Sequence, residues 1–309
     1  MTRRQVLFSV GSAAALRAQQ RYPGVTYRDY SWQSLFAFVG INALLALSVY
    51  ATLSCGQLSL ANAGFMAIGG YTAALLTLRL HAPFPLALAA AVAAPALLAV
   101  PLGLPVLRLR GVFLAIATIG FGEMVRLFFV NWETTNGAMG LVAIPLRTRG
   151  WMIALSVLLV LWLFGRLRGA RTGLALAAIR EDETAARTMG IDATAHKLAM
   201  FVLGAGIAGL AGALEAHLTY MISPTGFGFA RVVDMLVYAV VGGVGAFFGP
   251  ALGAAFLTLL PEVMREVASH TGVSPGPLRM LVNGVILLLV ILFLPNGLVS
   301  LPARLRRRR

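Results

Sequence analysis

Long apolar runs recur along almost the whole chain and are separated by short polar segments. The runs lie at about 35–54, 58–78, 85–107, 112–130, 151–165, 198–218, 232–248, 251–268 and 278–295. Each approaches the ~20 residues that a helix needs to cross the hydrocarbon core of a bilayer. Lipid offers the backbone no hydrogen-bond partners, so such spans are helices or a closed barrel, and these runs lack the strict alternation of barrel strands. The pattern predicts an all-α polytopic membrane protein with about seven to nine transmembrane helices.

One charged segment, at 173–197, interrupts this pattern. Apolar residues recur there at roughly helical spacing and charged residues supply the other side, which predicts a short amphipathic helix outside the bilayer. The apolar positions are Leu174, Ala177, Ala178, Ala185, Ala186 and Met189, and the charged ones are Arg180, Glu181, Asp182, Glu183 and Arg187. Gly190 can end this helix in the left-handed conformation. Such a helix either docks a soluble protein or only links two membrane spans.

The composition is that of a membrane protein and limits the kinds of partner to be expected. Hydrophobic residues make up 59% of the 309 residues and charged residues 12%, whereas about a quarter of a soluble domain is charged. The net charge of +14 is explained by arginines retained on the cytoplasmic side, so we expect no nucleic acid as partner. The arginine-rich end at 304–309 predicts a cytosolic anchor beside the lipid bilayer. Cys55 is the single cysteine, which excludes an intrachain disulfide and a thiolate metal cluster.

The arginines also orient the predicted spans. If the arginine-rich loop 166–197 is cytosolic, the run 232–248 returns to a tight inner turn at 242–250, and the C-terminus lies inside. The same count places residues 17–34 outside. Three arginines lie in that stretch, which contradicts the positive-inside tendency.

Two explanations of the N-terminus stay open. Residues 1–34 carry a twin arginine, a short apolar run and small residues, so they resemble an export signal or a degenerate first segment, which we favour. Alternatively, the run 58–78 is re-entrant and the N-terminus stays in the cytosol. The predicted division of the chain is this segment, a transmembrane domain at 35–300 that contains the loop 166–197, and a basic cytosolic tail at 301–309.

Few ionisable residues fall inside the predicted spans, and each is a functional candidate because charge in lipid is costly. Glu123 and Arg126 are one helical turn apart, where they either neutralise each other and fix helix packing or line a polar path. Glu215, His217 and Asp234 lie near span ends and are expected to be interfacial. A proton relay would need a connected series of acids and histidines at midplane depth, which the chain lacks.

The sequence carries no pattern of a catalytic or metal site. The histidines lie at or near predicted span ends, no HExxH occurs, and Lys197 does not follow a phosphate-binding glycine loop. We therefore expect no catalytic residue, no bound metal and no cofactor. If transport uses ATP, another subunit must bind it.

Two glycine-rich stretches interrupt the apolar pattern, one in each half of the chain. The first, at 56–76, also carries Gln57, Ser59 and Asn62, and the second lies at 240–256. Unwound backbone and small polar side chains are tolerated at membrane depth where they line a cavity or pack tightly within protein. We therefore expect a glycine-rich broken helix in each half.

A third group of small residues has a simpler interpretation. It comprises Gly204, Ala208 and Gly212, which are four apart. Small residues at this spacing let two helices approach closely, so we expect this group to mark a helix–helix contact.

Seven motifs follow one another along the chain. They are GQLSLANAGFMAIGGYTAALL (56–76), LRLRGVFLAIATIGFGEMVRL (107–127), TTNGAMGL (134–141), AIREDETAARTMGID (178–192), GIAGLAGALEAH (206–217), VVGGVGAFFGPALGAAFLTLLPE (240–262) and LFLPNGLV (292–299). As an ordered series they resemble the inner-membrane permease subunits of branched-chain amino acid ABC importers, specifically the LivM-type branch. The resemblance covers about residues 40–300.

The resemblance implies that 178–190 is a coupling helix that sits in a groove of the ATPase. The string TAARTMG, at 184–190, keeps the spacing of the family's EAA-three-residues-G loop, with Thr184 where glutamate is usual. The residues expected to couple to the ATPase are Arg180, Glu181, Asp182, Ala185, Ala186 and Gly190. The polar residues expected along the translocation pathway are Gln57, Ser59, Asn62, Thr118 and Glu123.

The chain departs from the family pattern at two places. The usual SLGHA is SLANA here, with Ala61 for glycine and Asn62 for histidine, so any role of that histidine in the pathway does not transfer. The usual first membrane span is shortened or replaced, which leaves both explanations of the N-terminus open.

By this resemblance the chain is a multi-pass permease subunit of an ATP-driven ABC importer in the bacterial inner membrane. It would move branched-chain or related amino acids without covalent chemistry. The implied partners are a second, LivH-like permease, two cytosolic ABC ATPases and an external substrate-binding protein. Two alternatives stay open: a urea or short-amide ABC permease of the same branch, and an ATP-independent secondary transporter in which 173–197 only connects two spans.

Overall fold

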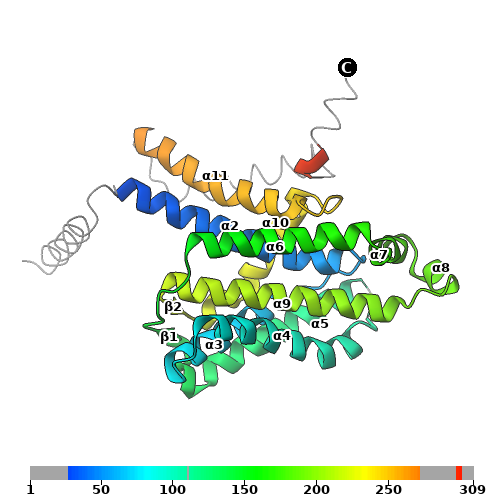
Figure 1. The fold of residues 1–309 in the computed structure, drawn as a ribbon, viewed down its shortest axis with the longest axis horizontal. Helices are drawn as coiled ribbons and strands as arrows, with labels where there is room; N and C mark the ends of the chain where they lie inside the picture. Colours follow the sequence, from blue (N-terminus) through cyan, green and yellow to red (C-terminus); the bar gives the residue numbers. More distant parts are fainter. Residues whose placement is uncertain (1–26, 110, 272–296, 301–309) are drawn as a thin grey trace, which may run out of the picture.

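The computed structural model describes residues 27–109, 111–271 and 297–300, whose helices form an elongated bundle (Figure 1). The helices are α2 (Tyr27–Leu53), α3 (Asn62–Arg79), α4 (Phe84–Val106), α5 (Val112–Asn131), α6 (Gly150–Gly169), α7 (Arg171–Glu181), α8 (Glu183–Thr188), α9 (Ala193–Thr219), α10 (Phe229–Gly242) and α11 (Gly249–Thr271). Short 3-10 turns are η1 (Glu133–Thr135), η2 (Gly137–Met139), η3 (Pro224–Phe227) and η4 (Leu298–Ser300). The strands β1 (Leu141–Val142) and β2 (Met221–Ile222) pair antiparallel. This architecture confirms the predicted all-α class.

Five of the described helices are long and apolar enough to cross a bilayer. They are the Trp32–Leu53 part of α2, together with α4, α5, α6 and α9. By contrast, α3 carries several polar residues, α10 has only 14 residues, and the described apolar part of α11 covers only Gly249–Leu260. The predicted span at 278–295 lies outside the described residues. The chain is a polytopic membrane protein, and the exact number of crossings stays a prediction.

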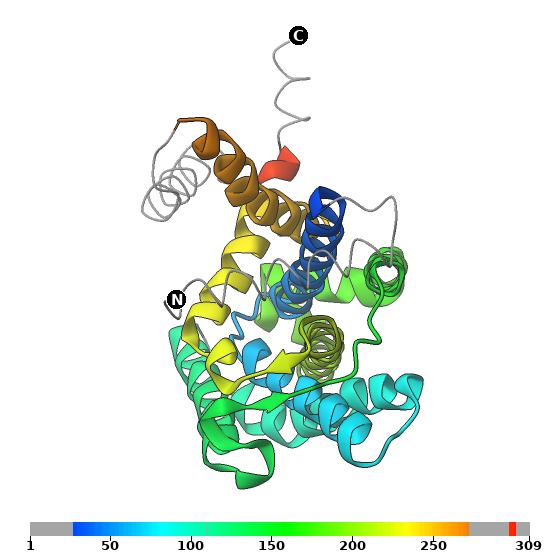
Figure 2. The same ribbon diagram turned by 90° about the vertical axis from the view of Figure 1, so that its left-hand side faces the viewer.

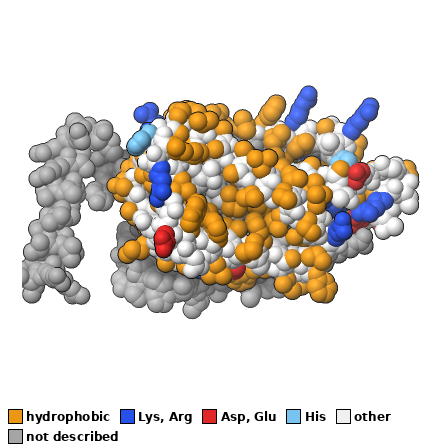
Figure 3. All heavy atoms as spheres, turned by 90° about the horizontal axis from the view of Figure 1, so that it is seen from below, with side chains coloured by type: hydrophobic (Ala, Val, Ile, Leu, Met, Phe, Trp, Pro, Cys, Tyr) orange, Lys and Arg blue, Asp and Glu red, His pale blue; other side chains and the backbone are white. Residues whose placement is uncertain are grey.

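The surface of the bundle is consistent with insertion in lipid. Hydrophobic side chains cover the middle of the face in Figure 3, and most charged side chains visible there lie toward its two ends. Such a distribution keeps charges at the level of water and headgroups and leaves the apolar side chains to the hydrocarbon.

Successive helices alternate in direction between the two ends of the bundle (Figure 1). α2, α4 and α6 run toward the end that carries α7 and α8, and α3, α5 and α9 run away from it. Gly56, just after α2, lies against the backbone of Arg180 in α7. Arg79, at the end of α3, donates a hydrogen bond to the Thr134 carbonyl at the opposite end. α3 therefore reaches the far end of the bundle, and both explanations of the N-terminus stay open.

α9 lies in the middle of the bundle and packs against α2, α3 and α4 (Figure 2). A methyl group at Gly209 would overlap the Ala91 carbonyl oxygen of α4, and one at Gly212 would overlap the Met66 carbonyl oxygen of α3. At Gly204, a methyl group would lie only 2.8 Å from a carbonyl oxygen of α2. These contacts confirm the helix–helix contact predicted for this group of small residues.

Only some of the glycines in the two glycine-rich stretches lie at helix breaks. In the first half, the chain is non-helical at 54–61, whereas Gly69 and Gly70 are inside the continuous α3. Both of these glycines meet the backbone of α9, so they permit close packing and do not unwind their helix. In the second half, the break at 243–248 separates α10 from α11 and lies at the same end as α7, as predicted for the inner turn.

Gly209→Ala is expected to lower the free energy of unfolding by about 1–3 kcal/mol, because the added methyl group has no room against α4. Gly120→Ala is the matched control, since a methyl group there meets nothing within 4 Å. Alanine also favours a helix over glycine by up to about 1 kcal/mol, so the control is expected to be neutral or stabilising. Thermal unfolding of the purified chain in detergent measures both variants. Equal melting temperatures would contradict the close packing of α9.

Candidate functional site

The charged segment at 173–197 folds as most of α7, the short helix α8 and the first turn of α9. α7 and α8 meet at Asp182, whose extended backbone has a φ of −151° and a ψ of 109°. Its carboxylate accepts hydrogen bonds from the amides of Thr184 and Ala185 at 2.8 and 3.1 Å, which caps the start of α8. The prediction of one continuous helix over 178–190 is therefore wrong, because an N-cap residue lies within it.

The break changes which apolar side chains of this segment are buried. Leu176 and Ile179 of α7 face the protein, whereas Leu174 and Met189 are 74% and 82% exposed. The extended residue Asp182 separates the two helices, so the apolar positions do not follow one continuous helix. Exposed apolar side chains outside a bilayer mark contact surfaces. Leu174 and Met189 are thus candidate contact residues, which the sequence analysis named only as apolar positions of this segment.

α8 is fastened to the first turns of α9. Glu183 forms ion pairs with Arg187 of α8 and with Lys197 of α9, both at 2.8 Å. Gly190 ends α8 with a φ of 82°, as its position predicted. Asp192 then caps α9 by accepting a backbone hydrogen bond at 3.0 Å. α7 and α8 are therefore joined to the central helix of the bundle by more than the covalent chain.

The residues expected to couple to an ATPase fall into two groups. The exposed ones are Arg180, Glu181, Asp182, Ala185 and Gly190. Ala186 is only 3% exposed and packs with Ile179 and Ala193 in a small apolar cluster inside this unit. Ala186 thus stabilises the unit from within, and its side chain is covered by the chain itself.

Four of the five pathway candidates come together around the irregular segment 54–61. They are Gln57, Ser59, Asn62 and Thr118, and all are buried. The Thr118 hydroxyl of α5 accepts a hydrogen bond from the Leu60 amide at 3.0 Å. The Asn62 side chain donates to the Ser48 hydroxyl of α2 at 2.8 Å. This polar cluster therefore joins α2, α3 and α5.

Two polar atoms of this cluster have no hydrogen-bond partner among the described residues. They are the side-chain nitrogen of Gln57 and the hydroxyl of Ser59. Leaving a buried polar group unpaired costs about 1–3 kcal/mol, so proteins rarely keep such groups without a functional reason. Unwound backbone with free polar groups at membrane depth is typical of ligand sites in transporters.

Glu123, the fifth candidate, lies apart from this cluster on α5. Arg126 donates a hydrogen bond to its carboxylate at 2.6 Å, which confirms that the two residues pair. The other carboxylate oxygen accepts from the Phe229 amide at 3.2 Å, at the start of α10. The pair is about a third exposed. It lies about 12 Å along the helix from the end of α5, so it falls within the thickness of the bilayer.

Two ionisable residues expected at the membrane interface have internal partners. His217 is fully buried and hydrogen-bonds the Thr77 hydroxyl of α3 at 3.0 Å, near the ends of both helices. Glu215 pairs with Arg231 at 2.7 Å and links α9 to the start of α10. Asp234 is exposed. Thr77, the partner of His217, is remote in the sequence, and Arg231, the partner of Glu215, lies beyond a loop. Helical periodicity does not predict such pairs.

Comparison with known proteins agrees with a membrane transport role. The family model described as "Branched-chain amino acid transport system / permease component" matches residues 32–291. The high-affinity branched-chain amino acid transport permease proteins LivM of Salmonella typhimurium and Escherichia coli are 34% identical over 302 residues, which span 85% of this chain and 67% of each relative. The corresponding LivH protein of Escherichia coli is 30% identical over 152 residues, 49% of this chain and 46% of the relative. No solved structure matches the chain.

The match covers every membrane-crossing helix of the described structure and both glycine breaks. These relatives are transport permeases and not enzymes, in agreement with the expectation that the chain catalyses no covalent chemistry. The chain belongs to the family of branched-chain amino acid transport permease components.

Proposed function

We propose that the chain is the membrane-spanning subunit of an ATP-driven importer for branched-chain or related amino acids in the bacterial inner membrane. The observation that carries this proposal is the unit formed by α7 and α8. It extends from one end of the bundle, exposes Leu174 and Met189, and is joined to α9 (Figure 1). An exposed apolar surface beside charges of both signs fits docking of a soluble ATPase.

The connections of this unit provide a route for mechanical work. Lys197 and Glu183 join α8 to α9, and Arg180 of α7 lies against Gly56 at the end of α2. A displacement imposed on α7 and α8 by nucleotide-driven closure of the ATPases would therefore act on α2 and α9 together. Rigid motion of packed helices is a usual way for transporters to alternate access.

The proposed importer needs three further kinds of subunit. A second permease of the LivH kind would complete the membrane part, two ABC ATPases would dock at the α7–α8 end, and an external binding protein would deliver solute to the opposite end. The printed names of the relatives support branched-chain amino acids as the cargo. A transport assay in which leucine and urea compete distinguishes this cargo from a short amide.

We assign the translocation pathway to the polar cluster of Gln57, Ser59, Asn62 and Thr118, with Glu123 at a second position. The unpaired polar atoms of Gln57 and Ser59 and the irregular backbone at 54–61 support the first position. The partly exposed Glu123–Arg126 pair supports the second, because an ion pair within the bilayer needs a polar or protein environment on its open side.

Replacing Leu174 and Met189 together by serine is expected to reduce co-purification of the ATPase at least tenfold, because the docking surface loses its apolar contacts; tenfold corresponds to about 1.4 kcal/mol. The matched control is serine at Met139 and Leu146, which are also exposed and lie at the opposite end of the bundle. Pull-down from solubilised membranes measures both. Equal recovery of the ATPase with both double variants would contradict docking at α7 and α8.

Cysteine at Met189 and cysteine at Met139 report which end is cytosolic. The two side chains are 82% and 83% exposed, and Cys55 adds little background because it is buried. A membrane-impermeant maleimide is expected to label Met139→Cys in intact spheroplasts and Met189→Cys only after permeabilisation. Rapid labelling of Met189→Cys in intact spheroplasts would place α7 and α8 outside and refute the coupling role.

Glu123→Gln is expected to lower the import rate about tenfold while ATPase co-purification stays unchanged. The variant removes the negative charge that pairs with Arg126, and a tenfold lower rate corresponds to about 1.4 kcal/mol. The amide oxygen of the glutamine can still accept a hydrogen bond from the Phe229 amide. Glu133→Gln, an exposed glutamate outside the spans, is the control. Import at the control rate in proteoliposomes with all subunits present would remove Glu123 from the pathway.

A further inference from the structure

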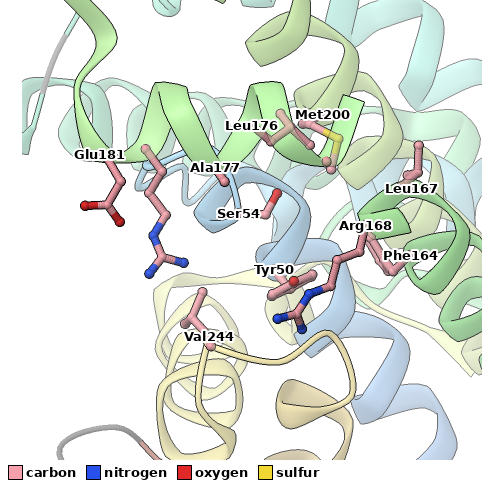
Figure 4. A pocket seen from close by; sticks show the side chains of 13 residues that line it. Tyr50, Ser54, Phe164, Leu167, Arg168, Leu176, Ala177, Glu181, Met200 and Val244 are labelled. Carbon is pink, nitrogen blue, oxygen red and sulfur yellow. The ribbon is translucent and has the colours of Figure 1, made fainter. Parts of the chain in front are cut away.

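A cavity of about 270 Å³ lies where α7 meets the ends of α2 and α6 and the turn before α11 (Figure 4). Its polar side is formed by Tyr50, Arg168, Arg180 and Glu181. Its apolar side includes Phe164 and Leu176. The cavity is therefore amphiphilic, and none of the pathway candidates Gln57, Ser59, Asn62 and Thr118 lines it.

The lining of this cavity carries more positive than negative charge: Arg168, Arg180 and Glu181 are its charged residues. Arg168 and Arg180 come from different helices, and each lies close enough to the Tyr50 hydroxyl to act on it electrostatically. Among the described residues, neither guanidinium forms an ion pair. Glu181 supplies one negative charge to the lining, so the lining keeps a net charge of about +1. Two guanidinium groups that share one cavity favour an anion with several acceptor oxygens.

The position of the cavity relates it to the surface of the bilayer. Phe164 and Leu167 belong to the last turns of α6, and Tyr50 and Ser54 to the end of α2, so the cavity lies where two membrane spans end. Of the five long apolar helices, α6 has the smallest share of buried residues, 17%, so it borders lipid. The cavity thus lies at headgroup level beside a lipid-facing helix. Basic pockets at this level attract anionic lipid headgroups.

We propose that this cavity binds the headgroup of an anionic phospholipid, with its phosphodiester between Arg168 and Arg180 and its acyl chains along the exposed side of α6. The bound headgroup would bridge α6 and the last turn of α7 and so hold α7 against the ends of α2 and α6. The inference rests on membrane insertion and the cavity lining. It does not require an ATPase to dock.

Binding of phosphatidylglycerol, phosphatidylcholine and inorganic phosphate to the delipidated full chain, measured by native mass spectrometry, tests the proposal. Phosphatidylglycerol is expected to bind at least tenfold more tightly than phosphatidylcholine, and this preference is expected to vanish in the Arg168→Gln/Arg180→Gln variant. Arg166→Gln/Arg171→Gln removes the same charge from neighbouring positions outside the cavity and is expected to keep the preference.

Three results would overturn the proposal. One is equal binding of the two lipids to the unchanged chain. Another is equal loss of the preference in both double variants, which would indicate only a diffuse basic surface. The third is displacement of phosphatidylglycerol by inorganic phosphate at similar concentration, which would indicate a site for a free anion.

Arg168→Gln alone, at a position outside the docking residues, is expected to weaken the preference for phosphatidylglycerol while leaving the thermal stability of the lipid-free chain unchanged. A negative outcome leaves ATPase docking untouched, because no step of the measurement involves that partner.

Discussion

Close backbone contact along α9 is the constraint on which the rest of this structure depends. Helices in lipid gain no hydrophobic energy from meeting one another, so their contacts rely on packing and hydrogen bonds. Gly204, Gly209 and Gly212 bring α9 against α2, α4 and α3, at distances that no larger residue would allow. α9 also follows directly after α8. The central helix of the bundle is therefore the helix that is connected to the α7–α8 unit.

This arrangement joins a soluble surface to polar groups inside the membrane. α8 is fastened to α9 through Glu183 and Lys197, and α7 lies against Gly56 at the start of the irregular segment 54–61. That segment holds the polar cluster whose side chains reach α2 and α5. The proposed docking surface is therefore connected to the proposed pathway by direct contacts of α7 and α8 with α9 and with the segment 54–61, as transmission of force requires.

The sequence alone predicted most of the fold, because length and apolarity are strong signals for helices in lipid. α2, α4, α5, α6 and α9 lie at the predicted runs, and their alternating directions follow from the distribution of arginine. The close contacts of α9 were predicted from small residues four apart. The break at Asp182 was missed, since an N-cap residue inside a charged helical pattern looks like any other polar position.

The site was less accessible to sequence reasoning, because burial and pairing depend on contacts between distant segments. The contact of buried His217 with Thr77, which lies on another helix, could not be predicted from helical spacing. Ala186 was expected to face a partner and packs inside its own unit. The Glu123–Arg126 pair was predictable because both residues lie on one helical turn, whereas the bond from Glu123 to the Phe229 amide required the fold.

The central claim is that work reaches the membrane helices through α7 and α8 from a nucleotide-hydrolysing partner. The most direct measurement is the accumulation of labelled leucine in proteoliposomes that contain both permeases and the binding protein, with and without the ATPases. The account predicts uphill accumulation only when the ATPases and ATP are present. Uphill accumulation of the same extent without the ATPases would contradict it.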